Sequence, residues 1–205
     1  MMRVALVLAA ALACSACSGG LLKSNAEPPA VYRLSATEVQ HGGQPLELAL
    51  VVARPRASAA LDTDRLAVVQ PGRGFDYFAG VRWAEPAPSM LQQLLVQALA
   101  ADGRFATTVA APSRVPTELL LDLELRRFEA VDAGEGHAPR VDVELQASLV
   151  DLRNGRRVAS FSAAASATAS ERRRPALIGA FQQATDAAFA TLLGSLRETS
   201  AELRP

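Results

Sequence analysis

The residues best placed to do chemistry are four acids that alternate with apolar residues along two segments of the chain. They are Asp122, Glu124, Asp142 and Glu144. Paired carboxylates can perform general acid–base catalysis, so a hydrolase acting through Asp122 and Glu144 is one hypothesis. Arg126 and Arg140 lie nearby in the sequence. They favour the other interpretation, in which the acids form a solvated sheet face with balanced charge.

The sequence offers little else for catalysis or metal binding. Its two histidines, His41 and His137, lie in separate glycine-containing segments, and neither belongs to a pair with metal-ligand spacing. It contains no Gly-x-Ser-x-Gly elbow, no glycine-rich phosphate loop with lysine and no His-Glu-x-x-His motif. We therefore expect no catalytic residues, no metal site and no cofactor, and hence no enzyme.

The start of the sequence indicates export and lipid attachment. Arg3 is followed by about ten apolar residues and then by small residues around Cys14 and Cys17, which is the pattern of a signal peptide. The apolar run is too short for a transmembrane helix, which needs about 20 residues. Residues 15–19 resemble a bacterial lipobox, which predicts acylation of Cys17, with Cys14 as the alternative. No later cysteine is available for a disulfide within the folded domain.

The chain is expected to have three parts. Residues 1–16 are the predicted lipoprotein signal peptide, residues 17–29 a flexible tether and residues 30–205 one folded domain. The 205 residues are half hydrophobic and one fifth charged, which is sufficient for a single packed core. The 21 basic and 21 acidic residues balance and are spread along the chain. Nucleic-acid binding is therefore not expected.

Alternating patterns predict a sheet. Residues 118–128 and 141–152 read as two long strands, each with one buried and one wet face, as in an antiparallel sheet covered on one side. Asn154-Gly155 predicts a tight turn into a third strand over residues 158–168. Shorter strands are expected at residues 31–34, 46–52, 66–69, 75–83 and 105–109.

Two amphipathic helices are predicted beside these strands. Ser89 and Gln92 have the spacing of a capping box at the start of the first helix, and Gly103 is placed to end it. Pro175 begins the second helix, which extends to about residue 203. About seven strands and two helices predict an α+β, two-layer fold, a mostly antiparallel sheet with both helices packed on one face. The sequence does not order the short N-terminal strands.

Aromatic residues are scarce, yet four of them occur within nine positions: Phe75, Tyr77, Phe78 and Trp83. One interpretation is core packing beneath the first helix. The other is an exposed edge, in which Phe75, Tyr77 and Trp83 form a partner interface. The arginine run at residues 172–174 precedes the second helix and is interpreted as a solvated helix start, with a surface contact as the alternative.

The chain resembles the ABC-type transport auxiliary lipoproteins, the PqiC-like lipoproteins that accompany MCE-domain lipid-transport systems. The resemblance rests on Tyr32-Arg33-Leu34, on residues 61–66 and above all on residues 75–91. It implies a non-catalytic accessory lipoprotein that is anchored to the periplasmic face of the outer membrane by acyl chains such as palmitate. Ser18, following Cys17, favours outer-membrane sorting by resemblance to bacterial lipoproteins.

The implied partner is the MCE-domain protein of an ABC-type lipid transporter, and self-association into a homo-oligomer is left open. The alternative is an outer-membrane assembly or scaffolding lipoprotein with a different envelope partner.

Overall fold

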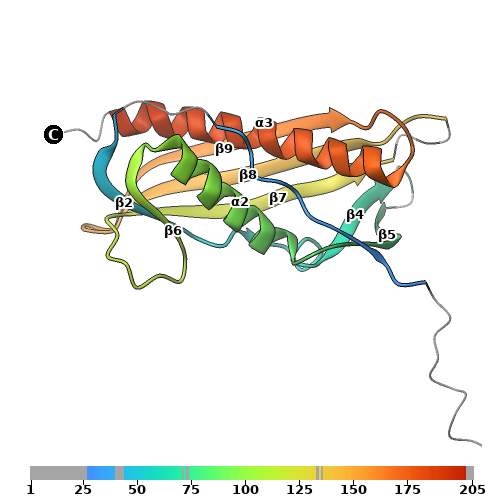
Figure 1. The fold of residues 1–205 in the computed structure, drawn as a ribbon, viewed down its shortest axis with the longest axis horizontal. Helices are drawn as coiled ribbons and strands as arrows, with labels where there is room; N and C mark the ends of the chain where they lie inside the picture. The colour runs from blue at the N-terminus through green and yellow to red at the C-terminus, as the bar shows by residue number, and fades with distance from the viewer. Residues whose placement is uncertain are drawn as a thin grey trace, which may run out of the picture.

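The computed structural model describes residues 27–39, 44–70, 72, 74–132, 134 and 136–201. These residues form one nine-stranded sheet and two helices that cover one of its faces (Figure 1). The strands are β1 (Ala30–Tyr32), β2 (Leu46–Val52), β3 (Arg56–Ala57), β4 (Arg65–Gln70), β5 (Gly74–Trp83), β6 (Phe105–Ala110), β7 (Leu119–Val131), β8 (Arg140–Asp151) and β9 (Arg156–Thr168). The helices are α2 (Ala87–Asp102) and α3 (Arg174–Ala201). The predicted α+β class is confirmed.

Strand β7 organises the sheet. One of its edges pairs with β8 in antiparallel orientation along its length, and β8 pairs likewise with β9. The other edge of β7 pairs in turn with β2, β3 and β4, which all run parallel to it. On the far side of these, β6 pairs with β2, and β5 and then β1 follow β4. The predicted antiparallel run of three long strands is therefore present, and most of the short N-terminal strands join the sheet in parallel.

A β-bulge changes the buried face of β7. The register with β8 shifts between Leu125 and Arg127, which leaves Arg126 outside the ladder. Before the bulge the fully buried residues have odd numbers, and after it they have even numbers, beginning with Phe128. A bulge adds one residue to one strand, so the side chains beyond it exchange faces.

The helices pack on different parts of the sheet. Helix α3 lies on β8 and β9, and α2 lies mainly on β6. The predicted apolar stripe of α2 is buried in full, at Leu91, Leu94, Leu95, Ala98 and Leu99. Gly103 ends this helix in the left-handed conformation, with φ of 67°, as the sequence predicts.

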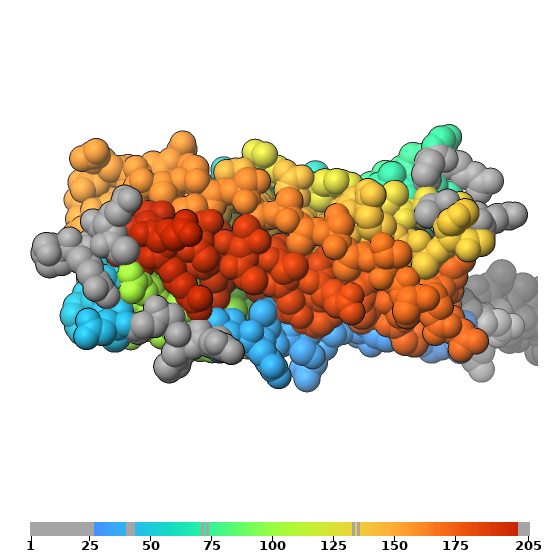
Figure 2. Space-filling view, turned by 90° about the horizontal axis from the view of Figure 1, so that it is seen from above, coloured from blue at the N-terminus to red at the C-terminus, as the bar shows by residue number. Residues whose placement is uncertain are grey.

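Residues 33–39 cross the helix layer as an extended strap. The Gln182 side chain of α3 accepts a hydrogen bond from the Ser35 N–H at 2.8 Å and donates one to the Ser35 carbonyl at 3.2 Å. Thr37 Oγ1 donates to Asp186 Oδ1 at 2.7 Å. Figure 2 shows this blue segment running along α3 on the side opposite β9.

The predicted capping box at the start of α2 is wrong. The helix begins at Ala87, and Pro86 occupies the N-cap position without a side-chain hydrogen bond. Ser89 lies within the first turn, where its Oγ accepts a hydrogen bond from Arg54 Nε at 2.9 Å. Gln92 donates to two backbone carbonyls outside the helix. Proline has a backbone conformation suited to the first helical turn, and Pro88 lies in that turn. The helix therefore begins before Ser89 and has no side-chain cap.

Candidate functional site

Several residues singled out in the sequence lie outside the described part of the structure. These are Cys14 and Cys17, the expected acylation positions, and His41. His137 lies in the loop between β7 and β8. Among the described residues, no group of three or more His, Cys, Asp or Glu side chains could hold a metal ion. The described helices include none with the length and apolar character needed to cross a membrane.

Trp83 is a core residue, which corrects the prediction that it belongs to an exposed interface. It is 1% exposed, and the rings of Phe128 and Phe181 lie 5.5 and 5.1 Å from its own ring. Gly80, with φ of 67°, and an irregular register with β4 interrupt the alternation of β5. Trp83 therefore points toward the helices and does not share a face with Tyr77. Core packing is therefore correct for this residue, whose ring contacts Phe128 of β7 and Phe181 of α3.

Phe75 and Tyr77 lie on the face of the sheet opposite the helices, as their pairing across β4 and β7 indicates. Their rings meet edge to face at 5.4 Å. The Arg65 guanidinium lies 3.8 Å from the Tyr77 ring centroid, a cation–π contact, and the Tyr77 hydroxyl donates to the Ala60 carbonyl at 3.0 Å. Phe75 is 42% exposed. We call Phe75, Tyr77 and Arg65 the aromatic patch.

All four predicted acids form ion pairs on the open face of the sheet, and three of them, Asp122, Glu124 and Glu144, stay partly exposed there. Asp122 pairs with Arg56 at 3.0 Å. Arg126, the bulge residue, lies 3.6 Å from Glu124 and 3.9 Å from Glu144. The register between β7 and β8 sets Asp122 and Glu144 opposite other residues, so these two acids are not a cross-strand pair. The arrangement matches a charge-balanced face.

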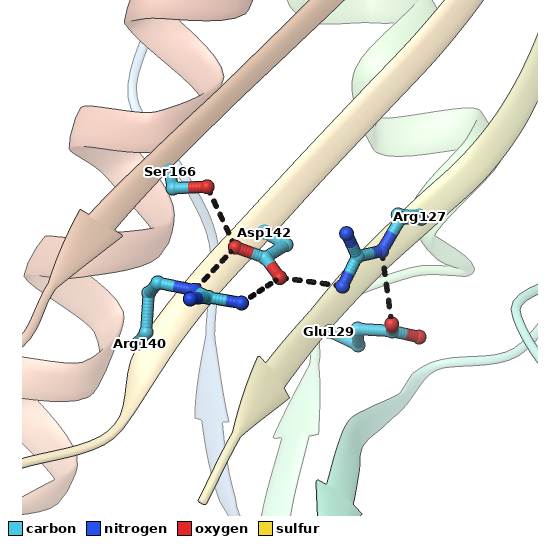
Figure 3. Close-up of polar contacts among 5 residues, drawn as sticks. All are labelled: Arg127, Glu129, Arg140, Asp142 and Ser166. Atoms are coloured by element: carbon cyan, nitrogen blue, oxygen red, sulfur yellow. Dashed lines mark hydrogen bonds and ion pairs between the residues drawn. The ribbon is translucent and has the colours of Figure 1, made fainter. Parts of the chain in front are cut away.

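Asp142 differs because its carboxylate is buried on this open face, with a side chain only 3% exposed. Figure 3 shows its surroundings. Arg140 donates to both carboxylate oxygens, at 2.8 and 2.9 Å. Ser166 Oγ donates at 2.6 Å from β9, and Arg127 Nη2 at 2.5 Å from β7. Arg127 Nε also donates to Glu129 at 3.2 Å. We call these five residues the Asp142 cluster.

The electrostatics of the Asp142 cluster favour a structural role. Burial alone would raise the pKa of Asp142, but hydrogen bonds from Arg140 and Ser166 and the positive charges of Arg127 and Arg140 outweigh it. The pKa of Asp142 therefore lies below its ordinary value. A general acid or base works best with a pKa near the working pH, and both oxygens of this carboxylate already accept hydrogen bonds. The cluster ties three strands together and is poorly suited to transfer protons.

Arg172 belongs to the predicted arginine run and forms hydrogen bonds with the loop between β7 and β8. Its Nη1 donates to Asp132 Oδ1 at 3.0 Å and to the carbonyls of Gly134 and His137 at 2.5 and 2.7 Å. The loop between β7 and β8 is thereby held against the start of α3. This contact is more specific than a solvated helix start.

Sequence reasoning missed three members of the Asp142 cluster: Arg127, Glu129 and Ser166. The bulge moves Arg127 and Glu129 to the open face, and nothing in the alternation before it signals this change. Ser166 carried a weak signal, because counting pairs back from the Asn154-Gly155 turn brings it near Asp142.

The fold is shared with other solved proteins. A crystal structure of a DUF330-family protein from Xanthomonas campestris is similar with a TM-score of 0.76 and 26% identity, covering 84% of this chain and 98% of that one. A crystal structure of an uncharacterized protein has a TM-score of 0.63 and 13% identity, covering 83% and 99%. The second likeness shows the fold alone. No curated protein matches the chain.

A family model described as the ABC-type transport auxiliary lipoprotein component matches residues 32–192. The chain belongs to this family, as its sequence resemblance predicts. It is therefore an auxiliary lipoprotein of ABC-type transport, a class of membrane-anchored proteins.

Proposed function

We propose that this chain is an outer-membrane-anchored periplasmic lipoprotein that docks on the MCE-domain component of an ABC-type intermembrane lipid transporter and has no catalytic activity of its own. The observation that carries the proposal is the family match over residues 32–192. Acylation of Cys17, or of Cys14 in its place, would supply the anchor. The arginine-bound acids of the open sheet face support a non-catalytic role.

The aromatic patch is the proposed docking surface. Phe75 is one of four large hydrophobic residues that are exposed in the described structure, with Val31, Val115 and Leu152. Exposed aromatic side chains beside an arginine are typical of the centres of protein interfaces. Phe75 and Tyr77 thus remain candidates for partner contact, while Trp83 does not.

Site-specific photo-crosslinking in cells tests the proposal. A photoreactive residue replaces Phe75 in one chain and Leu152, which is 45% exposed at the turn between β8 and β9, in the control chain. We expect an adduct with an MCE-domain protein from position 75 and none from position 152. The same adduct should weaken in a Cys17→Ala chain, because a chain without its anchor is diluted through the periplasm.

Two results would count against this assignment. Capture of a different outer-membrane assembly protein from position 75 would favour the scaffolding alternative. Failure to recover any MCE-domain protein with the unsubstituted chain from chemically crosslinked envelopes would contradict the transport partner itself.

A further inference from the structure

A small pocket opens where the start of α3 meets β4 and β5. Its volume is about 120 Å³, and Leu66, Val81 and Leu177, all buried, form much of its wall, with Phe78 and Ile178 beside them. Engineered apolar cavities of about 150 Å³ bind a benzene molecule. This pocket therefore fits one aliphatic side chain and is too small for a long acyl chain.

Positive charge dominates the rim of the pocket. Among the described residues, Arg172, Arg173 and Arg174 line it together with a single acid, Asp132. Asp132 forms an ion pair with Arg172 at 3.0 Å, and Arg173 forms one with Glu171 at 3.3 Å.

Arg174 has no acidic partner in the described part of the chain. Its Nη2 lies 3.3 Å from the position that a Cβ on Gly80 would occupy. The glycine thus leaves room for the guanidinium at the rim, where it is available to a carboxylate from outside.

A free strand edge borders the same region. Strand β1 pairs with β5 only at Val81 to Trp83, and no other described strand pairs with that edge of β5 between Gly74 and Gly80. An extended segment can add to such an edge through main-chain hydrogen bonds. Side chains of a strand alternate between faces, so neighbouring residues of an added segment would reach the pocket on one face and the aromatic patch on the other.

From these observations we infer that the pocket is an anchor site for an extended segment of a partner protein. The segment inserts one aliphatic side chain and places on Arg174 the carboxylate of the residue two positions away, which lies on the same face of the strand. The size of the pocket favours one aliphatic side chain, and the positive charge of its rim favours an acidic residue in the partner segment. The free edge of β5 binds the backbone of that segment. This inference rests on the proposed docking function and deepens it by naming the chemistry of the partner.

One residue of the pocket wall provides an NMR signal that can report binding. Ile178 is the only isoleucine in the sequence, so ¹³C-methyl labelling of isoleucine gives one NMR signal, and that signal comes from the pocket wall. The full acylated chain in phosphatidylcholine bicelles is titrated with the blocked peptide acetyl-Ser-Leu-Ala-Glu-Ser-amide, in which Leu and Glu share one face of an extended strand. Control peptides carry Ser in place of Leu, or Lys in place of Glu.

We expect a saturable shift of the Ile178 signal with the Leu-Ala-Glu peptide and much weaker effects with both controls. Arg174→Gln should weaken binding about three- to tenfold, the range between exposed and charge-assisted contacts. Arg157→Gln, the same change at an exposed position on β9, should leave binding unchanged.

Three results would overturn the inference. They are an unresponsive Ile178 signal, equal effects of Arg174→Gln and Arg157→Gln, and a shift caused by adding phosphatidylglycerol to the bicelles but not by the peptide. The outcome is separable from the proposed function. MCE-domain adducts with an unresponsive pocket overturn the anchor site alone, whereas peptide binding without such adducts counts against the transporter partner alone.

Discussion

Gly80 and Gly179 are both exposed glycines, but their backbones differ. Gly80 has φ of 67°, and a Cβ there would lie 3.3 Å from Arg174 Nη2. Gly179 lies in α3, where a Cβ would meet nothing within 4 Å. A left-handed conformation costs a residue with a Cβ about 1–2 kcal/mol, whereas alanine is favoured over glycine in a helix by about 0.5–1 kcal/mol.

Alanine substitutions at these two positions should therefore have opposite effects. Gly80→Ala should lower the free energy of unfolding by about 1–2 kcal/mol, and Gly179→Ala should raise it by about 0.5–1 kcal/mol. Urea denaturation of both variants measures the difference. Equal changes in the two would contradict the backbone argument.

At the residue scale, a single glycine also explains why the alternation of β5 gave a wrong prediction. Simple alternation places Phe75, Tyr77 and Trp83 on one face of a strand. Gly80 interrupts that strand, so Trp83 joins the core while Phe75 stays exposed. A glycine inside a strand pattern is the available signal for such a break, but it does not say which face follows.

At the scale of elements, Gln92 links α2 to the ends of two neighbouring strands, β2 and β6. Its Nε2 donates to the carbonyls of Val52 and Ala111 at 3.0 Å each. Gln92→Ala would leave the Ala111 carbonyl without this donor, whereas the Val52 carbonyl keeps the hydrogen bond from the Ala111 N–H at 2.9 Å. An unsatisfied buried polar group costs about 1–3 kcal/mol. We expect a loss in that range by urea denaturation. The neighbouring Gln93, which is exposed and binds Glu85, provides the control, and Gln93→Ala should change stability by about 0.5 kcal/mol or less.

Asp151 shapes the turn between β8 and β9. Arg153 donates its side-chain Nε and Nη2 and its backbone N–H to the Asp151 carboxylate, at 2.8 to 3.0 Å. The side-chain hydrogen bond from Arg153, followed by the backbone one, lowers the pKa of Asp151 from 3.8 to about 2. The folded pKa lies below the unfolded value, so protonation favours the unfolded chain. This stabilisation is complete above about pH 4 and is lost as the pH falls through 2.

The Asp151→Asn variant should lack that acid dependence. Between pH 4 and 2, we expect its Tm to fall less steeply than that of the unsubstituted chain, as followed by circular dichroism. Glu47→Gln, at an exposed position of β2, should keep the original slope. Parallel slopes for all three chains would contradict the role of Asp151.

How much of each element could be predicted depended on its length. The stripe of α2 and the alternation of β8 extend over many residues, and both were predicted close to their observed bounds. Strand β3, Arg56–Ala57, has only two residues, which is too few for any periodicity. The capping box failed because Ser89 and Gln92 are taken by tertiary contacts, which a local pattern does not contain.

For the molecule as a whole, three rings join the sheet to α3. Trp83, Phe128 and Phe181 lie with ring centroids 5.0 to 5.5 Å apart and come from β5, β7 and α3. Phe181→Ala should lower the free energy of unfolding by about 3–5 kcal/mol, the usual cost of removing a buried aromatic ring. Trp83 is the only tryptophan, so its fluorescence reports unfolding directly.

Phe75→Ala is the matched control, because Phe75 is 42% exposed. Its loss should cost about 1 kcal/mol or less, since a partly exposed ring contributes less buried area than a core ring. Comparable losses in the two variants would show that the three-ring cluster is not the centre of the core.

The candidate site was less predictable than the fold. Alternation was enough to find Asp142, but Arg127 reaches it only because of the bulge at Arg126, and Arg140 lies beside it on β8. Likewise, the arginines before α3 were visible in the sequence, whereas the pocket beneath them depends on which strands lie under the helix. Pairings between distant segments carry that information, and a local pattern does not.

The edge of β7 shared by β2, β3 and β4 has a consequence for synthesis. The ribosome releases a chain from its N-terminus, so these three strands are made before the strand that they pair with. At a synthesis rate of roughly 5–20 residues per second, several seconds pass before β7 is available to pair with the backbone hydrogen-bonding groups of these strands. The later strands β8 and β9 find their partners almost at once. The N-terminal half is therefore the part of the newborn chain that most needs a chaperone.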